Sequence, residues 1–161
     1  MRKRIIPAKP EHGSIAEGDW LDLENLAEVE ITSEDPKHPI EDALLPGRTA
    51  GWRAAQPGEQ TIRLVFQEPQ RINRIWLHFE EPHAQRTQQF VLRWSPDKGQ
   101  SFREIVRQQW NFSPEGSHDQ TEDIELSLTG VTTLELTIIP DISGGPTPAS
   151  LTQLRLGVGP R

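Results

Sequence analysis

Short runs of alternating apolar and polar residues, bounded by Pro and Gly, constrain the fold of this chain most. The clearest run is 60–66, where Ile62, Leu64 and Phe66 share one face and Pro57-Gly58 stands just before. A period of two is that of a half-buried β-strand, and Pro-Gly sequences favour turns. The sequence therefore predicts a strand that begins directly after a tight turn.

Further runs of this kind cover most of the chain, at residues 27–32, 71–80, 88–95, 102–107, 124–128, 134–138 and 150–158. Pro96-Asp97-Lys98-Gly99 predicts a hairpin, since Pro presets the turn and Gly supplies a positive φ. Residues 40–45 predict one helical turn, and residues 20–26 a short amphipathic segment. About eight short strands without a long helix predict an all-β fold, an antiparallel β-sandwich.

Length and composition narrow the class of protein. At 161 residues the chain fits one domain, which we expect at 20–161 after a mobile, Pro-rich lead-in at 1–19. The absence of cysteine excludes disulfides, thiolate metal sites and thiol nucleophiles. Pro7 and Pro10 interrupt the apolar region that a signal peptide needs, and no run of about 18 apolar residues predicts a membrane span. We therefore expect a cytoplasmic protein that is not embedded in a membrane.

Charge argues against general binding of nucleic acid. The net charge is -7, and residues 1–10 and 46–110 are basic on balance, the first with four basic groups and no acid and the second with ten basic groups against six acids. Affinity for nucleic acid depends mainly on neutralising phosphates, which an acidic chain does poorly. Only the middle segment could present a basic face, and an ordinary mixed surface is the simplest expectation.

The order of these segments resembles the discoidin, or coagulation factor 5/8 type C, group of galactose-binding-like domains. The resemblance spans residues 27–158. It rests on Ile31-Thr32-Ser33-Glu34, Ile40-Glu41-Asp42-Ala43-Leu44, Trp52, the strand and turn from Phe90 to Phe102, and a closing strand at 149–156. It implies a jelly-roll sandwich whose relatives usually bind ligands on loops at one end. Shared architecture does not by itself transmit function.

A narrower likeness lies around the opening strand. Trp52-Arg53-Ala54-Ala55, Gly58-Glu59, Thr61-Ile62 and Asn111-Phe112-Ser113-Pro114 resemble the amino-terminal domain of the X-ray-repair scaffold protein of single-strand-break repair. That resemblance implies a module that binds a repair polymerase or gapped DNA. The chain lacks the cysteines of that domain.

No motif indicates catalysis. There is no G-x-S-x-G sequence, and the five histidines, at 12, 38, 78, 83 and 118, lack metal-ligand spacing. Adjacent carboxylates such as Glu122-Asp123 face opposite ways on a strand. The S-x-D-x-G-x-x-aromatic sequence at 95–102 is interpreted as a turn in which Asp caps backbone amides. We therefore expect a protein that is not an enzyme.

The family resemblance suggests one ion, calcium, as a possible ligand. Sugar-binding discoidin relatives often hold a structural ion before the Trp, using an Asp and backbone carbonyls. Here Leu45-Pro46-Gly47 stands where those relatives usually have Asp-Gly. Asp42 and Glu41 could substitute, but calcium sites need several convergent oxygens. We predict no cofactor and no metal site.

Two groups of residues are candidates for binding. If neighbouring strands align, one outer sheet face carries Arg63, Arg74, Trp76, His78 and Arg93. Trp and Arg dominate protein interfaces, so the leading hypothesis is a module that binds a protein partner there. In the alternative, residues 1–26 fold over this face and bury Trp76.

The second group lies at one end of the predicted sandwich, and consists of Trp52, Arg53, Trp110, Asn111 and Phe112. An aromatic beside Arg or Asn suits stacking on a sugar or a base, so a carbohydrate-binding module is the second hypothesis. In a competing interpretation Trp52 only plugs the bottom of the sandwich. A module that binds nicked or gapped DNA is the third hypothesis, and the oligomeric state is left open.

Overall fold

A computed structural model describes residues 20–158 of the chain. The predicted lead-in at 1–19 lies outside the described residues. The elements are α1 (Leu23–Leu26), β1 (Ala27–Ile31), α2 (Glu41–Leu44), β2 (Trp52–Pro57), β3 (Gln60–Glu80), β4 (Arg86–Ser95), β5 (Arg103–Phe112), β6 (Asp119–Ile139), β7 (Pro148–Leu151) and β8 (Gln153–Gly157).

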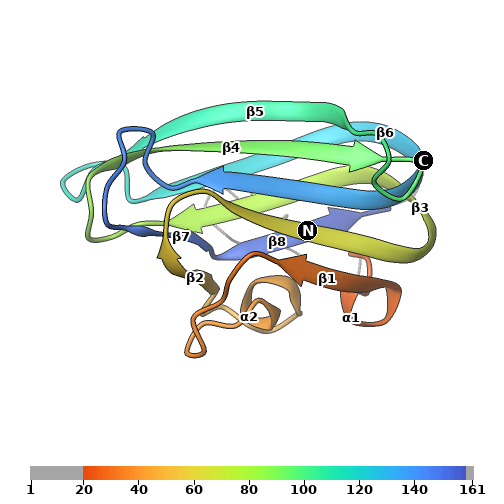
Figure 1. Cartoon of the computed structure of the whole chain (residues 1–161), viewed down its shortest axis with the longest axis horizontal. Helices are drawn as coiled ribbons and strands as arrows, with labels where there is room; N and C mark the ends of the chain where they lie inside the picture. The colour runs from red at the N-terminus through yellow and green to blue at the C-terminus, as the bar shows by residue number, and fades with distance from the viewer. Residues whose placement is uncertain (1–19, 159–161) are drawn as a thin grey trace, which may run out of the picture.

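The strands form two antiparallel layers. The large layer has the order β1, β3, β6, β4, β5, and Figure 1 looks onto it with β5 at the top. Behind it, the second half of β3 lies between β8 and the first half of β6. A separate pair, β2 with β7, lies at one end. The predicted all-β, antiparallel sandwich is confirmed.

Two long strands, β3 and β6, take part in both layers. The sequence predicts separate strands at 60–66 and 71–80, but the structure has one strand of 21 residues. Its register with β6 shifts between Val65 and Arg74, so the strand turns from one layer into the other there. The segment around Glu68-Pro69 lies at this shift, where Pro is tolerated because the ladder is already irregular.

The core fills the space between the layers. The large layer contributes alternate side chains such as Ile62, Leu64 and Phe90, and the second layer contributes Leu77 and Leu154, all at most 1% exposed. This is the burial that the period-two pattern predicts. Trp94 is also in the core, as expected from its phase with Phe90.

Local predictions for short segments are mostly confirmed. The helical turn expected at 40–45 is α2, and the hairpin across residues 96–99 joins β4 to β5. Lys98 and Gly99 adopt positive φ there, at 60° and 91°. The closing segment differs from expectation, because it is divided into β7 and β8.

Candidate functional site

The five residues predicted to share one outer face lie on two different layers. Arg63 and Arg93 are on the large layer, whereas Arg74, Trp76 and His78 belong to the half of β3 that pairs with β8. The prediction of a single basic face with an aromatic centre was wrong. Alternation gave the correct side of each strand segment but carried no information on the turn of β3 between layers.

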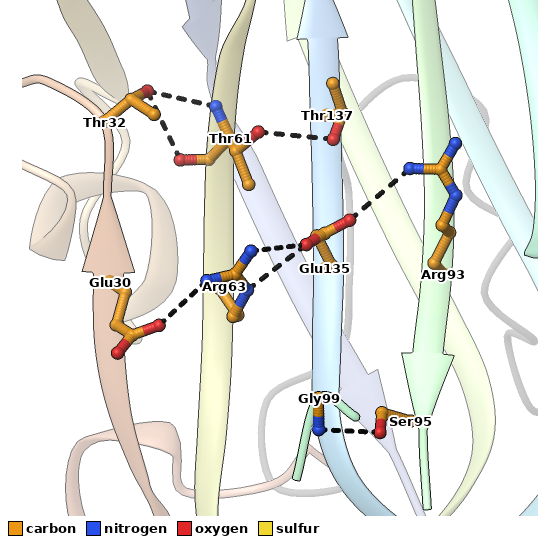
Figure 2. A network of polar contacts seen from close by, with 9 residues as sticks. All are labelled: Glu30, Thr32, Thr61, Arg63, Arg93, Ser95, Gly99, Glu135 and Thr137. Carbon is orange, nitrogen blue, oxygen red and sulfur yellow. Dashed lines mark hydrogen bonds and ion pairs between the residues drawn. The ribbon is translucent and has the colours of Figure 1, made fainter. Parts of the chain in front are cut away.

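On the large layer, Arg63 and Arg93 are joined through Glu135 of β6. Arg63 donates from Nη2 to Glu135 Oε2 at 2.7 Å and from Nη1 to Glu30 at 3.1 Å, and Arg93 Nη1 lies 3.5 Å from Glu135 Oε1. Figure 2 shows this row of alternating charge across four strands. The hydrogen bond with Glu135 raises the pKa of Arg63 above its ordinary value. Both arginines therefore have acidic partners within the chain.

On the second layer, Trp76 is 2% exposed and is stacked with His78, their ring centroids 5.7 Å apart. His78 Nδ1 lies 2.9 Å from Thr121 Oγ1. Arg74 makes a two-point ion pair with Asp123 at 2.8 and 2.9 Å, and its guanidinium lies 4.9 Å from the Trp20 ring centre. Trp76 and His78 are thus buried and are not available to a partner.

The end of the sandwich formed by β2, β7 and the loops after β3, β5 and β6 holds the second candidate group. Trp52 is 1% exposed, and its Nε1 donates to the Ser33 carbonyl at 3.1 Å. Gly51 has a φ of 81°, and a Cβ there would lie 2.9 Å from the Leu151 carbonyl oxygen. The backbone is therefore held close at this point, and Trp52 plugs the sandwich.

Phe112 is also a structural residue, contrary to the prediction. It is 1% exposed, and the guanidinium of Arg86 lies 4.8 Å from its ring centre. Arg86 Nε donates to Glu81 at 2.8 Å, and its Nη1 to the Pro140 carbonyl at 2.7 Å. Burial raises the pKa of Glu81, but its bonds from Arg86 and from two backbone amides outweigh that effect, so the pKa is lowered. This buried ion pair fixes the loops around it.

Trp110 and Asn111 lie near the end of β5 rather than in a loop. Trp110 is 36% exposed, one of the few large apolar side chains that the described residues present to solvent. With Gln109, Asn111 and Ser117 it lines a depression of 460 Å³. An open aromatic face thus stands among amide and hydroxyl groups.

Arg53 lines a second pocket, of 200 Å³. Its polar lining includes His38, Arg53, Glu80, Ser150 and Thr152. The backbone of Arg53 is held from both sides, since its N–H donates to the His38 carbonyl and its C=O accepts from Asp35. Its guanidinium has no ion pair with a described residue, although six other arginines do. The side chain is therefore exposed and charged, and no acidic side chain among the described residues pairs with it.

The segments that line the two pockets are joined by a backbone hydrogen bond. The Glu81 N–H donates to the His118 carbonyl at 2.6 Å, which joins the segment after Glu80 to the loop that carries Ser117. The sequence did not indicate that His38, Glu80 or Ser150 would be near Arg53, because these residues come from separate segments. Pairing of β2 with β7 places Arg53 opposite Ser150, and the bond from the Arg53 N–H to the His38 carbonyl places His38 beside Arg53.

The hairpin at 95–102 is a turn device, as predicted. Asp97 accepts from Ser101 N–H at 2.9 Å and from the hydroxyls of Ser101 and Ser95, each at 2.6 Å. These bonds, those of Ser101 foremost, lower the pKa of Asp97 to about 2. The hairpin lies at the far end of the sandwich from the two pockets, between β4 and β5 (Figure 1).

The candidates for calcium are not arranged as a site. Asp42 is bonded to Arg48 at 3.0 Å, and no group of three or more His, Asp or Glu side chains within residues 20–158 is placed to hold a metal ion. No helix in the same range is long and apolar enough to cross a membrane.

Comparison with known proteins bears on the fold. No family model and no curated protein matches the sequence. A module named CpGH89CBM32-5 from Clostridium perfringens, in complex with GalNAc-β-1,3-galactose, is similar with a TM-score of 0.62 and 21% identity, over 86% of this chain and 99% of that one. The family 32 carbohydrate-binding module of C. perfringens NanJ, in complex with galactose, gives 0.58 and 13%, over 81% and 92%.

A third similar structure is the family 32 module of AlyQ, in complex with 4,5-unsaturated mannuronic acid, with a TM-score of 0.58 and 14% identity over 84% of this chain and 97% of that one. The narrower resemblance to the X-ray-repair scaffold protein gains no support from these structures. The chain has the galactose-binding-like, or discoidin, fold that these carbohydrate-binding modules share.

Proposed function

We propose that the chain is a non-catalytic carbohydrate-binding module whose site is the end of the sandwich that carries the two pockets. The observation that carries the proposal is Arg53, which is exposed and has no ion pair with a described residue, in a polar pocket at the same end as a depression that exposes Trp110. Sugars present hydroxyl groups at their edges and C–H groups on their faces. A site for them needs hydrogen-bonding side chains and an apolar plane, and both are found here.

The pocket around Arg53 offers both kinds of hydrogen-bonding group. The guanidinium and the His38 ring can donate, the Glu80 carboxylate accepts, and the hydroxyls of Ser150 and Thr152 do either. Its 200 Å³ is below the roughly 300–1,000 Å³ of sites for drug-sized ligands, a size that suits one sugar ring.

The ligands bound in similar structures support this choice of ligand class. Those ligands are GalNAc-β-1,3-galactose, galactose and 4,5-unsaturated mannuronic acid. The protein-partner hypothesis, by contrast, needs one continuous face, and its five residues are divided between two layers and are buried or ion-paired. The DNA hypothesis stays a prediction that the net charge of -7 disfavours.

A glycan array followed by calorimetric titration of its hits tests the proposal. Arg53→Gln and Trp110→Ala should each weaken binding at least about tenfold, a change of about 1.4 kcal/mol, with an unchanged circular dichroism spectrum. Arg107→Gln is the matched control, because this exposed arginine pairs with Glu104 on the body of β5. No hit on the array, or wild-type affinity in both variants, would contradict the proposal.

A further inference from the structure

A separate apolar groove lies beside β1, away from the two pockets. Its volume is 330 Å³, and its apolar lining consists of Leu23, Ala27, Val29, Ile40, Leu44 and Leu45. Two carboxylates, Glu24 and Glu41, also line it. Figure 1 shows α2 beside β1, on the side away from β3. The groove is therefore bounded by an edge strand and by a short helix.

The edge of β1 that borders this groove has open backbone groups. Thr32 N–H donates to the Thr61 carbonyl of β3, and the same register continues from Ile31 to Ala27. Hydrogen-bonded pairs alternate in an antiparallel ladder, so the backbone groups of Val29 and Ile31 point away from β3. No hydrogen bond to a residue within 20–158 engages them. Such an edge can accept a further strand.

Charge decides which strand the edge would accept. Residues 20–45 carry eight carboxylates and a single lysine. Glu28 and Glu30 project from β1 itself, and Glu24 and Glu41, both exposed, have no ion pair with a described residue. Like charges on adjacent strands repel, whereas opposite charges stabilise the pair. An acidic strand, including β1 of a second copy, is therefore disfavoured, and a basic one is favoured.

We infer that this groove binds an extended, basic peptide segment of a partner protein, which adds as a strand to the edge of β1. Its aliphatic side chains lie against Val29 and Leu45, and its lysines or arginines pair with Glu24 and Glu41. This is a peptide site, independent of the proposed sugar site.

Titration with synthetic octapeptides tests the inference. The probe is Lys-Ile-Arg-Val-Lys-Ile-Arg-Val. One comparison peptide keeps its charge but has Ser and Thr in place of Ile and Val, and another keeps Ile and Val but has Glu in place of the basic residues. The probe should bind more tightly than both, and nuclear magnetic resonance should show the largest amide shifts at Val29 and Ile31.

Variants separate the groove from general attraction to an acidic protein. The double change Glu24→Gln with Glu41→Gln should weaken binding roughly fivefold, because two exposed ion pairs, each of modest strength, are lost. Glu59→Gln with Glu115→Gln removes two other exposed carboxylates and should leave affinity unchanged. Equal binding of the charge-matched polar peptide, unshifted amides at β1, or full affinity in the first double variant would overturn the inference.

Discussion

Replacing Trp52 by alanine separates its structural role from a role in binding. The indole is 1% exposed and fills the end of the sandwich. Truncation of a buried Trp costs about 3–5 kcal/mol, because contacts are lost and a cavity is left. The Ser33 carbonyl also loses its indole donor, which adds on the order of 1 kcal/mol. The free energy of unfolding should therefore fall by about 4–6 kcal/mol, a large part of the usual 5–15 kcal/mol.

Urea denaturation at 25 °C, followed by far-ultraviolet circular dichroism, measures this change. With a denaturant slope of about 2–3 kcal/mol/M, the midpoint should fall by about 2 M. Trp110→Ala is the matched control, since its side chain is 36% exposed, and it should lose no more than about 1 kcal/mol. The reasoning is refuted if Trp52→Ala unfolds near the wild-type midpoint but no longer binds sugar, because Trp52 would then contact the ligand.

Other changes test further parts of the structure. The hydrogen bonds to Asp97 stabilise the fold fully above the unperturbed pKa of 3.8, and this contribution is lost as the pH falls through the folded-state pKa of about 2. Asp97→Asn should therefore have a lower free energy of unfolding than wild type at pH 7 and an equal one below pH 2. A difference in free energy of unfolding that stays constant across this pH range would contradict this prediction. Glu135→Gln should lower the free energy of unfolding, measured by thermal denaturation, by about 1–2 kcal/mol, and the exposed Glu30→Gln should lower it by less than about 0.5 kcal/mol. Equal losses in the two variants would contradict the idea that Glu135, which pairs with both Arg63 and Arg93, is the more important carboxylate. Gly51→Ala should lower the free energy of unfolding clearly more than Gly47→Ala does. Both glycines have φ near 80°, but of the two only Gly51 has backbone atoms within 3.0 Å of the new Cβ. Equal urea midpoints of the two variants would show that the close approach at Gly51 is relieved without loss of stability.

The sequence predicted the fold class well because local patterns encode it. Alternation over 60–66 assigned the buried and outward sides correctly, whereas over 71–80 the side chains of Trp76 and His78 on the predicted outward side are buried as well. The Pro96–Gly99 turn was also predictable, since its residues dictate the backbone geometry. These features depend on neighbours only a few positions away.

The candidate sites were harder to predict because they depend on pairings between distant segments. Arg63 is neutralised by Glu135, 72 positions along the chain. The face shared by Arg63 and Trp76 was inferred from strand phase alone, which does not report a turn of the strand into another layer. Arg53 was identified by its residue type, but its pocket forms from the partner strand and from loops that no local pattern links.

The passage of β3 and β6 through both layers also affects how the molecule opens. The hydrogen-bonded ladder between them runs from the pair Gln60–Ile138 to the pair Glu80–Asp119, so each layer contains one half of both strands. Unfolding of one layer would disrupt strands that also belong to the other layer, so partial unfolding of a single layer is disfavoured. The same ladder joins residues far apart in sequence, which makes its closure slow in folding. We therefore expect the sandwich to unfold as a single cooperative unit, because β3 and β6 belong to both layers.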